Sequence, residues 1–396
     1  MSTSSVSSIL KDLGSTGNAF EDNEPGSREA LIERSRALVA ALEVPSEFVQ
    51  RSFWAEPALS AIIRLCVNVK LFQHLKEAGN IRLTPSALSE KTGVQLALLQ
   101  RLTRHLVAMY LITYHDGAFH ATTLSNGLAE ENYQHSISFY YDTARPSFNG
   151  FPAFFKQTRY RSPTLGGLGG PFQSAHNTQL PFFEWLVATP PDLEHFDSFM
   201  SAYRAGKPNW YDPGFYPVAE RMIAGFVSDV LLVDVGGGRG HDVALFAAQH
   251  GSHPGRIILQ DREPVIAAVV ATSEARPFEA QAHNFFTPLP VHGARAYSLH
   301  SILHDWGDEE GVQILQNLVP ALERGYSRVL LNEIVVSEEK PGLAASAMDM
   351  MMLAHFAVRE RTKAEWRDIL AKAGLKMVRI YQYPGAAESL IEAELA

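Results

Sequence analysis

One segment, residues 231–248, constrains the fold of this chain more than any other. It begins with the apolar run LLV at 231–233, continues through Asp234 into a turn rich in glycine, and ends in the apolar stretch VALFAA at 243–248. The first run predicts a strand buried on both faces of a parallel sheet. A strand, a glycine turn and a helix in this order form the first half of a nucleotide-binding βαβ unit. In such a unit glycine lets the backbone approach a ligand, and the helix N-terminus offers free N–H groups.

Two carboxylates indicate what kind of ligand this unit binds. Asp261 follows the next predicted strand, 256–260, about 20 residues after the turn, where a carboxylate binds a ribose diol. The other interpretation is that Asp261 caps a loop. Asp234 lies directly before the glycines, where it would repel a pyrophosphate but can pair with the amino group of an amino acid. S-adenosylmethionine has such an amino group and no phosphate, so the two carboxylates together favour this cofactor over a dinucleotide.

The composition excludes several classes of protein. The 396 residues are 46% hydrophobic and 19% charged, which is typical of a globular chain with room for two domains. The net charge of −9 leaves no basic surface for nucleic acid, and the single cysteine, Cys66, excludes an internal disulfide framework. Residues 1–17 lack the apolar core of a signal peptide, and no apolar run approaches the ~20 residues that span a bilayer. These features predict a soluble, cytoplasmic protein with no membrane partner.

The N-terminal half is expected to be helical. Residues 1–26 are polar and predict a mobile arm, or one that becomes ordered only against a partner chain, and a helical domain follows over 27–215. A helix at 56–77 is apolar over most of its circumference, which favours burial on several sides, including by another subunit. A helix capped at residue 84, a helix at 95–109 and a hairpin over 111–122 predict a winged helix, a module that often binds DNA. Its second helix carries only Arg101, Arg104 and His105 in an acidic chain, which disfavours DNA binding.

Residues 133–222 are rich in aromatic side chains. Most of these rings are expected to form ordinary core. So many flat rings between proline- and glycine-containing loops also suit a pocket for a planar, apolar ligand.

From residue 216 onward, strands and helices alternate. After Asp261, helices are expected at 264–273, 311–322, 344–358 and 366–373, and strands at 294–299, 328–333 and 377–383. This alternation predicts a doubly wound, Rossmann-like α/β domain over 216–396, preceded by the mostly α-helical winged-helix domain.

A histidine follows the strand predicted at 294–299, on the edge where open α/β sheets bind ligands. Three histidines directly precede an aspartate: His115, His241 and His304. His115 falls in the hairpin and His241 at the glycine turn, whereas His304 has Glu333 and Glu360 expected nearby. An imidazole held by a carboxylate can remove the proton of a phenol or alcohol, since its pKa lies near neutrality. The spacing alone also allows His304 and Asp305 to be an ordinary helix-cap and loop pair without a catalytic role.

With these residues in place, the sequence resembles a known family, the class II (plant-type) S-adenosylmethionine-dependent O-methyltransferases of fungal secondary metabolism. The resemblance extends from about residue 27 to the C-terminus. It rests on the motifs VDVGGGRGHD (233–242), LQD (259–261), HNFFTP (283–288), ARAYSLHSILHDW (294–306), LLNE (330–333), MDMMML (348–353) and RERT (359–362).

The resemblance implies a role for each candidate residue. His304 is the general base with Asp305 on its cofactor side, while Glu333 and Glu360 orient the imidazole and balance its charge. The glycines line the methionine moiety of S-adenosylmethionine, Asp261 binds the ribose and the aromatic ring after Asn284 contacts the adenine. The full cofactor set is Asp234, Gly236, Gly237, Gly238, Asp261, Arg262, Asn284, Phe285 and His300, and no metal is expected. The resemblance also implies a homodimer, and the substrate expected is an aromatic or polyketide-like small molecule.

Two positions depart from the family pattern. The residue that contacts adenine is usually Asp but is Asn284 here, whose carbonyl can still accept a hydrogen bond. The usual Lys or Arg four residues before the base is His300. These departures leave a second hypothesis open, because a fungal branch of the family resembles pericyclases that keep the cofactor bound without transferring its methyl group. In that branch His135 and a cationic residue near His300 would polarise a substrate carbonyl. The intact base and its two glutamates favour methyl transfer.

Overall fold

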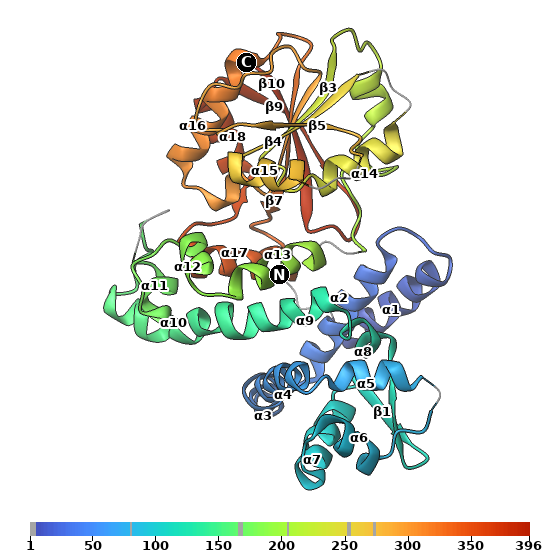
Figure 1. Ribbon diagram of the computed structural model, residues 1–396. Coiled ribbons are helices and arrows are strands. Elements are labelled where there is room, and N and C mark those ends of the chain that lie inside the picture. Colours follow the sequence, from blue (N-terminus) through green and yellow to red (C-terminus); the bar gives the residue numbers. More distant parts are fainter. Residues whose placement is uncertain (1–4, 80, 165–168, 204–205, 252–254, 272–274) are drawn as a thin grey trace. The chain divides into compact units, whose positions relative to one another are not determined.

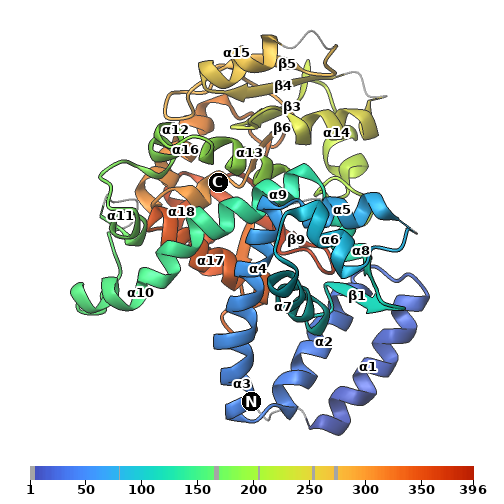
Figure 2. The same cartoon turned by 60° about the horizontal axis from the view of Figure 1, so that its bottom comes forward.

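The computed structural model describes residues 5–79, 81–164, 169–203, 206–251, 255–271 and 275–396 (Figures 1 and 2). Contacts divide the chain into two compact units. A mostly helical unit comprises 1–14, 33–162 and 171–206, and an α/β unit comprises 15–32, 163–170 and 207–396.

The described part of the α/β unit contains an eight-stranded sheet with the order β5-β4-β3-β6-β7-β10-β9, and β8 pairs with β7. The pairs between β3, β4, β5, β6, β7 and β8 are parallel, whereas β10 runs antiparallel to both β7 and β9. The strands are β3 (Val230–Val235), β4 (Arg256–Asp261), β5 (Glu279–Ala282), β6 (Ala296–His300), β7 (Arg328–Val336), β8 (Arg361–Thr362), β9 (Leu375–Gln382) and β10 (Glu388–Leu395).

Helices cover both faces of this sheet (Figure 1). Helices α14 (His241–His250) and α15 (Glu263–Ala271) contribute to one hydrophobic cluster with Leu330 of β7. Helices α16 (Asp308–Leu318) and α18 (Lys363–Lys372) contribute to the other cluster with Leu331, the next residue of the same strand. Successive side chains of a strand point to opposite faces, so the two clusters lie on the two sides of the sheet. This arrangement confirms the predicted doubly wound α/β fold.

The strand order places a ligand crevice at β3 and β6. From β3 the chain proceeds through β4 to β5 on one side, and it then returns to form β6 on the other side of β3. Open α/β sheets bind ligands outside the carboxyl ends of the strands at such a reversal. Asp234 is the penultimate residue of β3, Asp261 ends β4 and His300 ends β6, so the fold brings these three predicted site residues to one edge.

The helical unit contains the predicted winged helix. Helices α6 (Pro85–Thr92) and α7 (Leu96–Ala108) precede the hairpin of β1 (Ile112–His115) and β2 (Ala118–Ala121). The hairpin turns at Asp116 and Gly117, whose φ angles of 52° and 71° are those of a two-residue turn with left-handed backbone. Thr84 caps α6 by accepting a hydrogen bond from the backbone N–H of Ala87 at 3.2 Å. Leu88, Leu99 and Phe119 are buried in the core between these elements.

Further helices complete the described chain. They are α1 (Val6–Glu21), α2 (Ser27–Leu42), α3 (Pro45–Gln50), α4 (Glu56–Asn68), α5 (Leu71–Ala78), α8 (Thr123–Gly127), α9 (Glu131–Ser138), α10 (Arg145–Gln157), α11 (Pro171–His176), α12 (Phe182–Ala188), α13 (Asp192–Tyr203) and α17 (Leu343–Phe356). Shorter helical turns lie at Arg51–Ala55, Phe139–Ala144, Ala219–Ile223, Leu303–Asp305 and Val319–Ala321.

The N-terminal segment differs from the expected irregular arm over 1–26. Its described part forms helix α1 at Val6–Glu21. The apolar residues Val6, Ile9, Leu10 and Leu13 recur at helical spacing, and Ile9 is buried. The serines and glycines around this narrow apolar stripe lower the local helix propensity and conceal it in the composition.

The single helix predicted over 56–77 is two helices. Helices α4 and α5 meet at Lys70, whose φ of 52° breaks the helical backbone, and the run Pro45–Asn68 is bent by 71° relative to α5. Among the described residues no single helix is long and apolar enough to cross a membrane, although this bent pair passes the same length and composition test when taken together.

Three strands, β5, β8 and β10, are not predicted by the sequence pattern. In β10 two acidic side chains, Glu388 and Glu392, are buried. Glu392 accepts hydrogen bonds from Arg221 at 3.1 Å and from the hydroxyl of Tyr381 at 3.0 Å. Arg221 is far from β10 in the sequence and Tyr381 lies on the neighbouring strand β9. The residue pattern within β10 therefore does not show that its glutamates can be buried.

Candidate active site

The glycine turn after β3 is fixed to the end of β4. The N–H groups of Gly236 and Gly237 donate to the carbonyl of Gln260 at 2.7 and 3.2 Å, and the N–H of Gly238 donates to Asp261 Oδ2 at 2.8 Å. A Cβ at position 237 would lie 2.1 Å from Asp234 Oδ2, so only glycine leaves room there. The predicted carboxylates and glycines are therefore brought together in one place.

Asp234 is the most unusual polar group of this turn. Its carboxyl is buried, and Oδ2 finds no hydrogen-bond partner among the described residues. Burial first, and then the charges of Asp242 and Asp261, raise the pKa of Asp234 to about 7, while His300 opposes the shift. An unsatisfied buried carboxylate is costly, and a ligand with a positively charged amino group would offset that cost.

Phe285 lies beside Gly236 of the glycine turn. Its half-buried ring is 3.6 Å from the position that a Cβ on Gly236 would occupy, and it makes an edge contact with Trp306 at 6.0 Å between centroids. Asn284 is exposed, and its Oδ1 accepts a hydrogen bond from the N–H of Phe286 at 3.1 Å. Arg262 donates its backbone N–H to Asp261 Oδ1 at 2.7 Å, while its side chain is exposed. The cofactor roles of these residues stay predictions.

His300 lies between two carboxylates at the end of β6. Its Nδ1 donates to Asp242 of α14, and its Nε2 lies 3.4 Å from Glu388 Oε2 of β10. Neither of these two carboxylates was predicted from the sequence as a partner of His300. Asp242 could have been found, since it belongs to the glycine motif, whereas Glu388 comes from a strand that was not predicted. Where the family has a lysine or arginine, this chain has an imidazole flanked by acidic groups.

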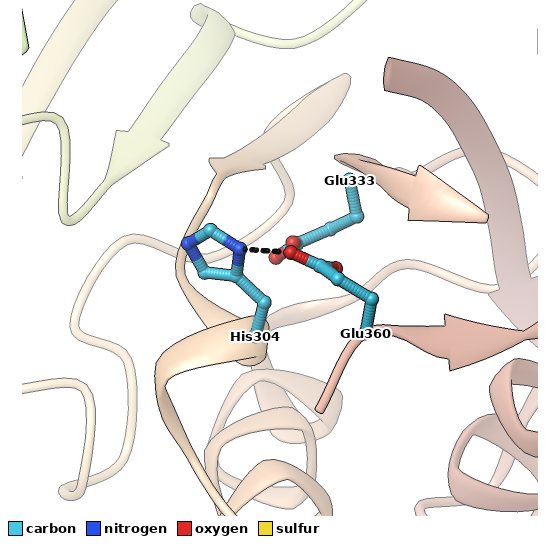
Figure 3. A group of neighbouring side chains, drawn as sticks. All are labelled: His304, Glu333 and Glu360. Carbon is cyan, nitrogen blue, oxygen red and sulfur yellow. Dashed lines mark hydrogen bonds and ion pairs between the residues drawn. The ribbon is translucent and has the colours of Figure 1, made fainter. Parts of the chain in front are cut away.

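The second group of site residues surrounds His304 (Figure 3). His304 lies in the short helical turn Leu303–Asp305 after β6, and its Nδ1 donates to Glu360 Oε1 at 2.9 Å. Its Nε2 is 3.6 Å from Asp305 Oδ1. Glu333 of β7 accepts hydrogen bonds from the N–H groups of Ile302 and Leu303 at 3.0 and 2.8 Å, so it holds the backbone of the same turn.

Charge in this group favours the protonated imidazole. Burial lowers the pKa of His304, but the charges of Asp305, Glu333 and Glu360 and the hydrogen bond to Glu360 outweigh it and raise the pKa to about 10. Burial also raises the pKa of Glu333 to about 7 and that of Asp305 to about 6, and His304 opposes both shifts. The proton on His304 is therefore strongly stabilised, so the neutral imidazole that can accept a proton is the minor form near neutral pH.

The same group has the geometry of a possible metal site. Ligand atoms of His304, Glu333 and Glu360 all lie within 4.8 Å of one another, and within the described ranges no other group of this kind is found. Glu333 Oε2 and Glu360 Oε2 are buried and find no hydrogen-bond partner among the described residues. The predicted base function uses the same three side chains without a metal.

His135, the remaining predicted residue, belongs to the helical unit. It lies on α9, where Nδ1 is 2.8 Å from the hydroxyl of Ser198 on α13. Its ring is 5.0 Å from that of His195. Burial, and then the nearness of His135, lowers the pKa of His195. His135 is therefore a partly buried, hydrogen-bonded residue.

Comparison with known proteins identifies the family. The O-methyltransferase domain family matches residues 221–376. O-methyltransferase mpaG of Penicillium roqueforti (strain FM164) is 62% identical over 399 residues, with 100% of both chains covered. The solved structures titled "A Pericyclic Reaction enzyme" and "The structure of LepI complex with SAM" each match with a TM-score of 0.88 at 26% identity, covering 98% of this chain and 99% of theirs. The chain belongs to the O-methyltransferase family.

S-adenosylmethionine is the cofactor of this family, and the residues around the glycine turn fit it. The unpaired Oδ2 of Asp234 can accept from the amino group of the methionine moiety. Asp261 at the end of β4 retains lone pairs for the ribose hydroxyls beside its two backbone donors. The absence of a side chain at Gly237 leaves room for the Asp234 carboxylate beside the turn.

We predict that Gly237→Ala weakens cofactor binding. The new methyl group would overlap Asp234 Oδ2, and relieving the overlap moves the carboxylate, at a cost of roughly 1–3 kcal/mol or about 10- to 100-fold in affinity. Isothermal titration calorimetry with S-adenosylhomocysteine measures the change. Gly342→Ala is the matched control, because Gly342 has a φ of −74° and no atom lies within 4 Å of the added Cβ. Equal affinity in both variants would contradict the assignment.

Proposed function

We propose that this protein transfers the methyl group of S-adenosylmethionine to a hydroxyl group of an aromatic or polyketide-like small molecule in secondary metabolism, with His304 as the general base. The observation that carries this proposal is the buried imidazole of His304, held by Glu360 at 2.9 Å on the turn that follows β6. The 62% identical relative named O-methyltransferase mpaG supports the same reaction class.

In the proposed reaction the two ring nitrogens of His304 have different tasks. Because Glu360 accepts the hydrogen bond from Nδ1, the neutral ring keeps its lone pair on Nε2, which is then the atom that takes the substrate proton. When the hydroxyl proton moves to Nε2, the ring becomes an imidazolium that Glu360, Asp305 and Glu333 stabilise. The bound cofactor supplies the electrophilic methyl group. The protein therefore contributes deprotonation and alignment of the oxygen with that methyl group.

Mass spectrometry during turnover tests the proposed reaction. Incubation with S-adenosylmethionine and extract from the producing pathway should yield S-adenosylhomocysteine and a product heavier by one methylene group. Consumption of a substrate without S-adenosylhomocysteine would reject methyl transfer.

We predict that His304→Ala lowers kcat by about 100- to 10,000-fold, the usual contribution of a general base, while the affinity for the cofactor stays unchanged. Steady-state kinetics and calorimetry measure the two quantities. His115→Ala is the matched control, since His115 also precedes an aspartate but lies exposed in the β1–β2 hairpin. Wild-type kcat in the His304 variant would remove His304 from the mechanism.

We predict that Glu360→Gln moves the pH profile of kcat/KM to lower pH. The active base is the neutral imidazole, so activity rises as the pH passes the pKa of His304. Loss of the Glu360 charge and of its charge-assisted hydrogen bond lowers that pKa from its raised value of about 10. The plateau also falls, because the amide stabilises the imidazolium less well. Glu338→Gln, an exposed change in the same unit, should leave the profile in place, and an unmoved profile in Glu360→Gln would contradict the proposed base.

A second candidate function is a pericyclic reaction with the cofactor retained. It is favoured by the contact of His135 with Ser198 at 2.8 Å and by the similarity to the solved pericyclic reaction enzyme. In that case His135→Ala and His300→Ala would abolish product formation, His304→Ala would not, and S-adenosylmethionine would stay unconsumed.

We also propose that the protein is a homodimer formed through its N-terminal helices. A run of large apolar side chains is exposed along residues 39–54, from the end of α2 through α3 and the following helical turn. They are Val39, Leu42, Val44, Phe48, Val49, Phe53 and Trp54, with Phe53 at 69% and Trp54 at 67% exposure. A contiguous apolar surface of this kind is a common mark of a protein interface.

We predict that the double change Phe53→Asp and Trp54→Asp converts the dimer to monomers, because it places two charges in the apolar contact. Size-exclusion chromatography with light scattering measures the mass. Tyr110→Asp is the control, since Tyr110 is 87% exposed and lies outside this surface. A wild-type protein that is already monomeric would contradict the proposal.

A further inference from the structure

The RERT motif at 359–362 contains one charged residue to which nothing above assigns a role. Glu360 holds the imidazole of His304, and Thr362 caps α18 by accepting a hydrogen bond from the N–H of Glu365 at 3.3 Å. Arg359 is an exposed ion-pair partner of Asp308 at 2.9 Å. Arg361 is different, because its side chain is only 1% exposed, which is rare for a charged residue.

The guanidinium of Arg361 holds both ends of the His304 turn. Its Nη1 donates to the carbonyl of Leu303 and its Nη2 to the carbonyl of Trp306, each at 2.7 Å. These two carbonyls bracket His304 and Asp305 in the chain. The planar fork of arginine can reach both acceptors at once, which a lysine ammonium on the same strand could not do equally well.

The arginine is itself fixed on its other sides. Its Nε donates to Asp308 Oδ1 at 2.9 Å, and the guanidinium carbon lies 5.3 Å from the centroid of the Trp366 ring. The indole N–H of Trp366 donates to the carbonyl of Ile334 at 3.1 Å, next to Glu333 on β7. Arg361 therefore links the His304 turn to the same strand that carries Glu333.

The turn that carries His304 needs such support because the backbone leading into it has an unusual conformation. Ser301, directly before it, has a φ of 52°, a conformation that residues other than glycine rarely adopt. Residues kept in this region persist when the surrounding structure holds them there. Glu333 holds two N–H groups of the turn and Arg361 holds two of its carbonyls, so the backbone is restrained through donors and acceptors alike.

From these contacts we infer that Arg361 is a positioning residue for the general base: Glu360, directly before β8, holds the side chain of His304, and Arg361, the first residue of β8, holds the backbone on both sides of it. This inference rests on the proposed function. Arg361 does not touch the reacting atoms, and its effect on the reaction passes through the place and orientation of the imidazole. Small displacements of a catalytic group have large effects on rate, and a shift of 1 Å can cost about 100-fold.

The test compares three variants. Arg361→Met keeps the unbranched stem and removes every donor, Arg361→Lys keeps the charge, and Arg359→Ala removes the neighbouring arginine that also pairs with Asp308. We expect kcat to fall about 100-fold in Arg361→Met and less in Arg361→Lys. KM and cofactor affinity should change little, and Arg359→Ala should keep wild-type kcat. An unchanged kcat in Arg361→Met, or an equal loss of kcat, substrate affinity and cofactor affinity, would overturn the inference.

A second measurement separates failure of this inference from failure of the proposed function. Histidine-labelled protein reports the pKa of His304 by NMR without any turnover. Loss of the Arg361 charge would itself raise this pKa, so the titration is followed in Arg361→Lys, which keeps the charge. If Arg361 positions the ring against Glu360, Arg361→Lys lowers this pKa and Arg359→Ala does not. An unmoved His304 titration together with wild-type kcat in Arg361→Lys overturns the inference, whereas absence of methyl transfer by the wild-type protein rejects only the proposed function. Arg361→Lys serves for both measurements if Arg361→Met does not fold.

Discussion

Burial of charge around His304 is the constraint on which the catalytic half of the molecule depends. Carboxylates that leave water are stable only where hydrogen bonds and opposite charges replace it. Glu333 receives two backbone N–H groups, and Glu360 receives the imidazole N–H. These partners come from β7, from the turn after β6 and from the segment before β8. The register of the central strands therefore sets the chemistry, since a displaced strand would leave a buried carboxylate without its partner.

Much of the fold could be predicted because its signals are local. The apolar run at 231–233 and the glycines after it define β3 and its turn within a dozen residues, and the hairpin turn at Asp116 and Gly117 depends on two residues alone. Glu388 and Glu392 in β10 show the opposite case. Their burial is possible only because Arg221, His300 and Tyr381 meet them in the folded chain, and that is a property of tertiary structure.

The residues of the candidate site also fall into those that local sequence signals predict and those that depend on tertiary structure. His304, Glu333 and Glu360 could be proposed from residue type and from their places after a predicted strand, at the end of the next strand and after a predicted helix, and the structure brings them close together. The contact of His300 with Glu388 could not be anticipated, because it depends on a strand that returns antiparallel from the C-terminus. The fold alone does not decide the reaction, since its solved neighbours include a pericyclic reaction enzyme. Single side chains on the same fold decide which reaction takes place.

The buried carboxylate of Asp234 has a consequence for turnover. If it pairs with the amino group of the cofactor, it contacts a part of the molecule that methyl transfer leaves untouched. S-adenosylhomocysteine carries the same amino group, so Asp234 would bind donor and spent donor alike. Interactions that are equal before and after the reaction raise affinity without lowering the barrier. Exchange of the spent cofactor must then depend on the region around the sulfur, where the two molecules differ by a methyl group and a positive charge.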